Sequence, residues 1–141
     1  MNFPILSSIT LLPILGAVFV LIFNNEKSEN KNAIYVSLFT STINLFLAIF
    51  LWNVFDVSSP EFQFVEEKNW INGYIKFKFG IDGISILFIV LTAFITPICI
   101  ISCINSVKTR LKEFLIAILI LESFMIGVFC SLDLVIFYLF F

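Results

Sequence analysis

Residues 114–131 read FLIAILILESFMIGVFCS, an apolar run whose polar members are Glu122, Ser123 and Ser131. At a rise of about 1.5 Å per residue, these 18 residues would form a helix of roughly 27 Å. The hydrocarbon core of a bilayer is about 30 Å thick, so a helix of this length can cross it. The run therefore predicts a membrane-spanning helix with one carboxyl close to its middle.

Three other segments satisfy the same criterion of about 20 mainly apolar residues, at positions 3–23, 33–55 and 82–104. A further apolar segment, 132–141, is half as long as a span requires. The sequence predicts an all-α, multi-pass membrane protein in which residues 1–141 form one membrane segment, with four helices and the start of a fifth. We expect a chain with such a half-span to be a fragment, either a truncated product or one piece of a larger subunit, because the last carbonyls of the half-span have no partner in lipid unless other protein covers them.

The composition excludes several other classes of protein. Sixty per cent of the residues are apolar and 13% are charged, against about half and a quarter in soluble domains. A soluble globular domain, a disordered tail and a basic nucleic-acid-binding arm are therefore not expected, and neither is a nucleic-acid partner. The apolar excess predicts contact with lipid.

The loops suggest an orientation. The short loops 24–32 and 105–113 carry five basic residues, whereas the opposite side carries three, in the longer loop 56–81. The positive-inside rule then places both short loops inside and the N-terminus outside. Within loop 56–81, apolar and polar residues alternate on both sides of Asn72-Gly73, a pattern typical of a β-hairpin. We expect this small hairpin on the outer surface, between the second and third helices.

Glu122 is the candidate for proton chemistry. A charged side chain near the centre of a span costs about 2.5–3.5 kcal/mol to insert on translocon scales, and such carboxyls commonly mark ion pathways. Lys112 lies about 15 Å away along the same helix, so a partner for Glu122 has to come from another helix or from water. A proton relay is the favoured role. The alternative is a carboxyl that only holds neighbouring helices together.

Three other polar residues have expected structural roles. Asn44, near the centre of the second span, is expected to form an interhelical hydrogen bond, or else to line a hydrated path. Asp82 is interpreted as the N-cap of the third helix. Ser131 and Asp133 are interpreted as the cap and the first-turn acid of the fifth.

The sequence offers no catalytic, metal-binding or cofactor-binding residues. It has no His, and its three Cys, at positions 99, 103 and 130, lie in apolar runs where packing is their expected use. It also lacks a phosphate-binding loop, a zinc-ligand spacing and a dinucleotide fingerprint.

Three strings of the sequence resemble a known family. They are FQFVEEKNWI at 62–71, FGIDGIS at 79–85 and LESFMIGVFCSLDLVIFYLFF at 121–141. Together they resemble the N-terminal quarter to third of chain M, or chain 4, of the proton-pumping NADH:quinone oxidoreductases, respiratory complex I. In that family Glu122 matches an acid of the fourth helix, and Asp82 and Asp133 are usually retained. The family's best-known pump glutamate follows directly after the string that ends here at Phe141.

The resemblance implies an antiporter-like subunit of the membrane arm, in a bacterial plasma membrane or a mitochondrial inner membrane. NADH, FMN, iron–sulfur clusters and quinone would be held by other subunits. The expected partners are the lipid bilayer, other membrane-arm subunits and the remaining C-terminal part of the same subunit, without which we expect no proton translocation. Two alternatives stay open: a subunit of a cation/proton antiporter, against which the string FQFVE argues, and a small polytopic scaffold or assembly protein without transport activity.

Overall fold

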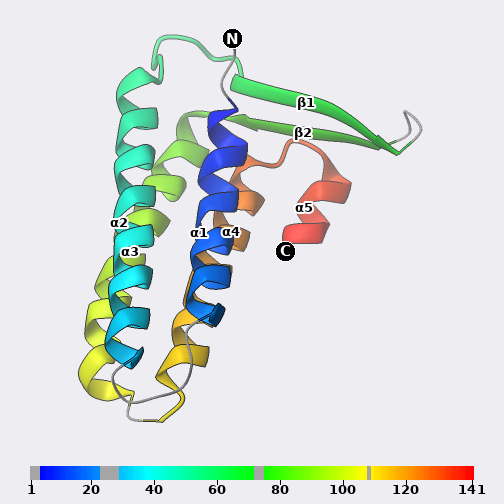
Figure 1. The fold of residues 1–141 in the computed structure, drawn as a ribbon. Helices are drawn as coiled ribbons and strands as arrows, with labels where there is room; N and C mark the ends of the chain where they lie inside the picture. Colours follow the sequence, from blue (N-terminus) through cyan, green and yellow to red (C-terminus); the bar gives the residue numbers. More distant parts are fainter. Residues whose placement is uncertain (1–3, 23–28, 72–74, 108) are drawn as a thin grey trace.

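The computed structural model describes residues 4–22, 29–71, 75–107 and 109–141. Four long helices run alternately up and down in a bundle (Figure 1). They are α1 (Ile5–Ile22), α2 (Glu29–Val54), α3 (Gly83–Ser106) and α4 (Leu111–Cys130). A short helix, α5 (Leu134–Phe140), follows. The all-α membrane fold predicted from the sequence is confirmed, with four helices among the described residues that are long and apolar enough to cross a membrane.

The helices expose apolar side chains on their outward faces. Phe19 of α1, Phe39 and Phe46 of α2, and Ile101 of α3 are each more than half exposed in the isolated chain. Several polar residues of the same helices, such as Thr10, Asn44 and Thr92, are buried inside the bundle instead. A helix that is apolar around most of its circumference suits a lipid environment, so the bundle has the distribution expected of a membrane protein.

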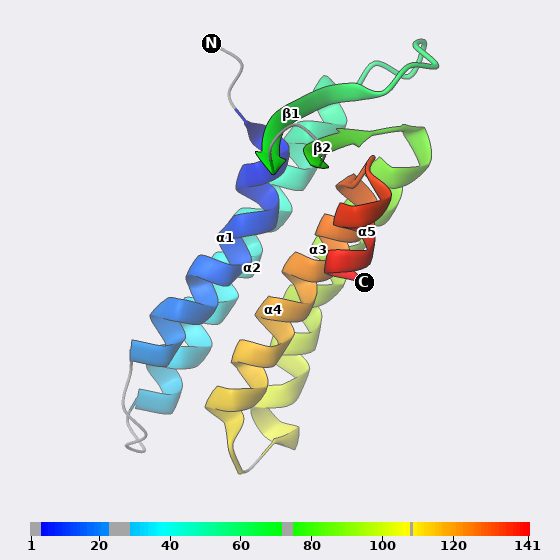
Figure 2. The ribbon, with the colours of Figure 1, turned by 90° about the vertical axis from the view of Figure 1, so that its right-hand side faces the viewer.

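The four helices pack in a closed ring, with an additional contact across its centre. Each helix packs against its two neighbours, and α2 also contacts α4 diagonally (Figure 2). A close approach between α1 and α2 depends on Gly16, because a Cβ atom there would lie within 3 Å of the Thr40 side chain. The diagonal contact brings α2 and α4 together in the centre of the bundle.

Two clusters of buried apolar residues fill the bundle. The hairpin-end cluster includes Leu6, Leu51, Phe79, Ile89 and Ile126. The loop-end cluster, toward the short connections, includes Ala17, Val20, Ala33, Ile100, Leu115 and Leu119. Along α1, α2 and α4, buried polar residues fall between the positions that contribute to the two clusters. The bundle is therefore apolar at both levels and polar in between.

The predicted hairpin between α2 and α3 is confirmed. Strands β1 (Gln63–Ile71) and β2 (Ile75–Ile81) pair antiparallel; the expected Asn72-Gly73 turn lies outside the described residues. The hairpin lies across one end of the bundle and extends over α5 (Figure 1). Phe79 of β2 forms a bridge with Ser131, and Leu132 N donates to Lys78 O at 3.0 Å. These bonds attach the connection between α4 and α5 to the hairpin.

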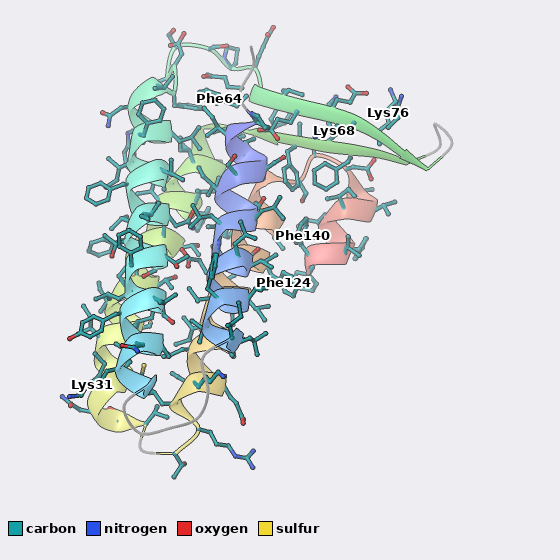
Figure 3. The ribbon with its side chains drawn as sticks, viewed as in Figure 1. Lys31, Phe64, Lys68, Lys76, Phe124 and Phe140 are labelled. Atoms are coloured by element: carbon teal, nitrogen blue, oxygen red, sulfur yellow. The ribbon has the colours of Figure 1, made fainter. Side chains whose placement is uncertain are left out.

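The short helix α5 packs against α4. Gly127 permits this approach, because a Cβ atom at that position would lie 2.6 Å from the Phe140 ring. Phe140 also makes an edge contact with Phe124 of α4, with ring centroids 6.1 Å apart (Figure 3).

Candidate functional site

Glu122 lies inside the bundle, where α4 contacts α2. Its side chain is 1% exposed. Asn44 of α2, which is fully buried, donates from Nδ2 to Glu122 Oε1 at 2.8 Å. The partner of the carboxyl thus comes from another helix. Of the two alternative roles expected of Asn44, the structure shows the interhelical hydrogen bond.

Each of the two residues has one side-chain oxygen that does not take part in this hydrogen bond. Within the part of the chain that the structure describes, Glu122 Oε2 and Asn44 Oδ1 are buried and have no hydrogen-bond partner. A buried polar atom without a partner is costly, at about 1–3 kcal/mol. The two oxygens could accept hydrogen bonds from a donor such as water.

The pair belongs to a set of nine buried polar residues, which we name the polar layer. They come from all four long helices: Thr10, Ser37, Thr40, Ser41, Asn44, Thr92, Thr96, Glu122 and Ser123. All the hydroxyls except that of Ser123 donate to backbone carbonyls of their own helix, a common arrangement for Ser and Thr in membrane helices. Their protons are therefore already bonded, and Glu122 is the only carboxyl in the layer.

Ser123 instead connects two helices. Its Oγ donates to the Thr10 carbonyl of α1 at 2.5 Å, in a buried position. Consecutive residues of an α-helix point about 100° apart, since the helix has 3.6 residues per turn. Glu122 therefore faces α2 while Ser123 faces α1. The sequence interpretation did not identify this role, although Glu122-Ser123 is a visible polar pair within an apolar run.

The two aspartates singled out in the sequence, Asp82 and Asp133, lie at helix N-termini, away from this pair. Asp82 is the N-cap of α3 and accepts from Ser85 N at 2.7 Å. The hydroxyl of Ser85 and its backbone N–H lower the pKa of Asp82. Asp133 is the N-cap of α5 and accepts from Val135 N at 2.8 Å. Both aspartates thus make capping hydrogen bonds.

The expected role of Ser131 was wrong. Ser131 is the C-cap of α4, and its hydroxyl donates back to Val128 O at 2.8 Å. Asp133 itself takes the N-cap position of α5. The physical reason is that α5 begins only at Leu134, so Ser131 lies two residues before the N-cap position, where it bridges to Phe79 instead.

The described residues contain no group of three or more His, Cys, Asp or Glu side chains arranged to hold a metal ion. Cys103 and Cys130 are buried in the core, whereas Cys99 is exposed on the outward face of α3. The packing role expected of the cysteines thus fits two of the three.

Comparison with known proteins identifies relatives along almost the whole chain. No family model matches it. It is 46% identical over 137 residues to NADH-ubiquinone oxidoreductase chain 4 of Marchantia polymorpha. The matched region covers 96% of this chain and 27% of the relative. It is 44% identical over 139 residues to NADH-quinone oxidoreductase subunit M of Rhodobacter capsulatus, covering 97% of this chain and 27% of the relative.

A third relative is subunit M of Rickettsia prowazekii, with 40% identity over 143 residues, 100% of this chain and 29% of the relative. The chain thus spans less than a third of the length of these curated relatives. The resemblance noted in the sequence is confirmed. With its four apolar helices, the chain is an integral, multi-pass membrane protein. Over the length that it matches, it is homologous to NADH-quinone oxidoreductase subunit M, also named NADH-ubiquinone oxidoreductase chain 4.

Proposed function

We propose that the chain forms part of an antiporter-like subunit in the membrane arm of a proton-pumping NADH:quinone oxidoreductase, and that Glu122 takes up and releases a proton there. The observation that carries this proposal is the environment of Glu122. Among the described residues, this buried carboxyl has one neutral partner and one unpaired oxygen, and it lies between two apolar clusters.

The polar layer has few groups that could serve instead. Asn44 does not titrate, and most of the hydroxyls donate to carbonyls of their own helices. A proton that reaches the layer would therefore reside on Glu122. The unpaired Oε2 is the atom at which a donor such as water could approach. Ionisable groups in this kind of position commonly belong to ion pathways.

The partners and cofactors follow from the same proposal. NADH, FMN, iron–sulfur clusters and quinone would be bound by other subunits of the complex. The chain would contact other membrane-arm subunits, the remainder of its own subunit and lipid, and its membrane would be the bacterial plasma membrane or the mitochondrial inner membrane. Alone, the chain is expected to leave a proton gradient across vesicles intact.

The orientation is part of the proposal. The chain connects α1 to α2 and α3 to α4, and the helix ends joined by these connections lie opposite the hairpin, near Lys31 (Figures 1 and 3). The greater number of basic residues in these connections places that end on the inner side. The hairpin is then on the outer side.

The test is Glu122→Gln in the assembled complex, which keeps the shape of the side chain and removes its proton. Protons pumped per NADH oxidised are expected to fall, while NADH oxidation by an artificial acceptor at the peripheral arm stays normal. Glu113→Gln is the matched control, because Glu113 lies on the same helix but is exposed and pairs with Arg110 at 3.7 Å. Unchanged pumping with normal assembly would assign Glu122 to helix association, the role expected in a scaffold protein.

A further inference from the structure

Glu66 of the hairpin binds the first turn of α1. Its Oε1 accepts from Leu6 N at 2.8 Å, and its Oε2 accepts from Ser7 N at 3.2 Å and from the Ser7 hydroxyl. The first N–H groups of a helix have no partner within the helix, and the positive end of the helix dipole favours an anion. A carboxylate 60 positions away in the sequence therefore caps α1.

An irregularity in the hairpin accompanies this contact. Gln63 pairs with Ile81 and Glu66 with Phe79, so two residues of β1 oppose Gly80 alone. This is a β-bulge, a device that changes the direction of a side chain. Phe64, inside it, has φ 54°, a backbone conformation that is unfavourable for a bulky residue. Phe64 lies close to the start of α1 (Figure 3).

The same turn of α1 is bonded to the polar layer. The Thr10 hydroxyl donates to the carbonyls of Leu6 and Ser7, the two residues whose N–H groups Glu66 accepts. The Thr10 carbonyl in turn accepts from Ser123, which lies in the middle of α4 beside Glu122. Hydrogen bonds thus connect the hairpin, α1 and α4 in series.

We propose that Glu66 is a positioning residue for the pair Glu122 and Asn44. The faces of α1 are mainly apolar, and in lipid such faces gain little from the hydrophobic effect when they associate. Polar bonds then fix how far α1 slides or turns, and charge-assisted bonds are the stronger ones. By holding α1, Glu66 sets the height and rotation of Thr10 O, and thereby of Ser123 and Glu122. The functional meaning of this role rests on the proton-carrying function proposed above.

The backbone carbonyls in this series carry no exchangeable proton, so the connection is mechanical. Glu66 holds the helices in place and does not itself pass a proton to Glu122. This distinction determines the measurement, which has to report on the surroundings of Glu122 and not on proton flux.

The experiment uses the full chain in lipid nanodiscs and infrared spectroscopy. The absorption of the Glu122 carboxyl is identified as the band lost in Glu122→Gln. In Glu66→Gln this band is expected to shift in frequency. A shift is also expected in Ser123→Ala, which removes the last bond of the series. Glu67→Gln is the matched control, since Glu67 is the next residue of β1, is exposed and pairs with Lys76 at 2.8 Å. It should leave the band unchanged.

A folded Glu66→Gln chain with an unshifted band would overturn the proposal. If that variant does not fold, Ser7→Ala decides, because it removes one donor to Glu66 and keeps the helix. In Ser7→Ala, a band shift in the same direction as in Ser123→Ala, but smaller, supports the proposal. An unshifted band in Ser7→Ala refutes it. This result does not depend on the pumping test. Normal pumping in Glu122→Gln would refute the proton relay, but the band shift in Glu66→Gln could still be observed.

Discussion

Asn44 and Glu122 lie 78 positions apart in the sequence, and a hydrogen bond of 2.8 Å joins them where α2 contacts α4. Both side chains are almost completely buried, and each keeps an oxygen without a partner among the described residues. The bond therefore has two consequences, one for the stability of the bundle and one for the chemistry of the carboxyl.

Replacing Asn44 by Leu should destabilise the chain by about 1–3 kcal/mol, because the buried Glu122 carboxyl then loses the hydrogen bond that Asn44 donates. Asn53→Leu is the control: Asn53 is exposed on the same helix and donates to Ile49 O of its own helix. Unfolding of both variants in mixed micelles measures the difference. Equal stabilities would show that the bond between α2 and α4 does not stabilise the bundle.

Gly127→Ala should destabilise the packing of α5, by about 1–3 kcal/mol. The added methyl group would lie 2.6 Å from the Phe140 ring, whereas a Cβ at Gly83 meets nothing within 4 Å. Gly83→Ala is therefore expected to be neutral or slightly stabilising. Proteolysis of the C-terminal segment and unfolding curves should separate the two variants, and identical behaviour would argue against the close α4–α5 contact.

Asp82→Ala should lower the free energy of unfolding by about 1 kcal/mol, because α3 loses its N-cap. Hydrogen bonds from Ser85 lower the pKa of Asp82 from its ordinary 3.8, so the carboxylate form is favoured by folding. The stabilisation that ionised Asp82 gives to the folded chain is present above pH 3.8. It is lost as the pH falls through the lowered pKa of Asp82.

The matching control is Asp82→Asn, a side chain that can still cap the helix but does not titrate. The stability of this variant at neutral pH should stay close to that of the parent chain, and the acid-induced loss assigned to residue 82 should disappear. If the parent chain and the Asp82→Asn variant lose stability identically between about pH 2 and about pH 5, the assignment of the lowered pKa is contradicted.

Cysteines introduced at Lys31 and Ser59 should react with a membrane-impermeant maleimide from opposite sides of the membrane. Lys31 lies at the end of the bundle away from the hairpin (Figure 3), and Ser59 precedes β1. Lys31→Cys is expected on the inner side. Labelling of Lys31→Cys from the outer side would reverse the proposed orientation.

The sequence was sufficient to predict the parts of the fold that depend on local pattern. The four spans follow from the length of apolar runs, the hairpin from alternation around Asn72-Gly73, and the capping of α3 from Asp82. It could not predict which residues meet across helices. The bonds of Glu66 to α1 and of Ser123 to Thr10 join positions 60 and 113 apart, and no spacing rule relates them.

The candidate site was predictable to the same extent. Glu122 and Asn44 were each identified because they are polar residues in the middle of an apolar run, but their pairing depends on the diagonal contact of α2 with α4. Ser131 was misassigned because its bridge to Phe79 involves the backbone of a distant strand. Residue type indicates that a group needs a partner, and the packing of helices determines which one.

The position of Glu122 between two apolar clusters also has an electrical consequence. When one elementary charge crosses the whole membrane, its electrical energy changes by about 2.3 kcal/mol for every 100 mV of transmembrane voltage. Most of that voltage drops across the regions of low dielectric constant, and here such a region lies on each side of the carboxyl. A proton that arrives at Glu122 from either surface has therefore already traversed part of the field, and its occupancy there should respond to voltage as well as to pH.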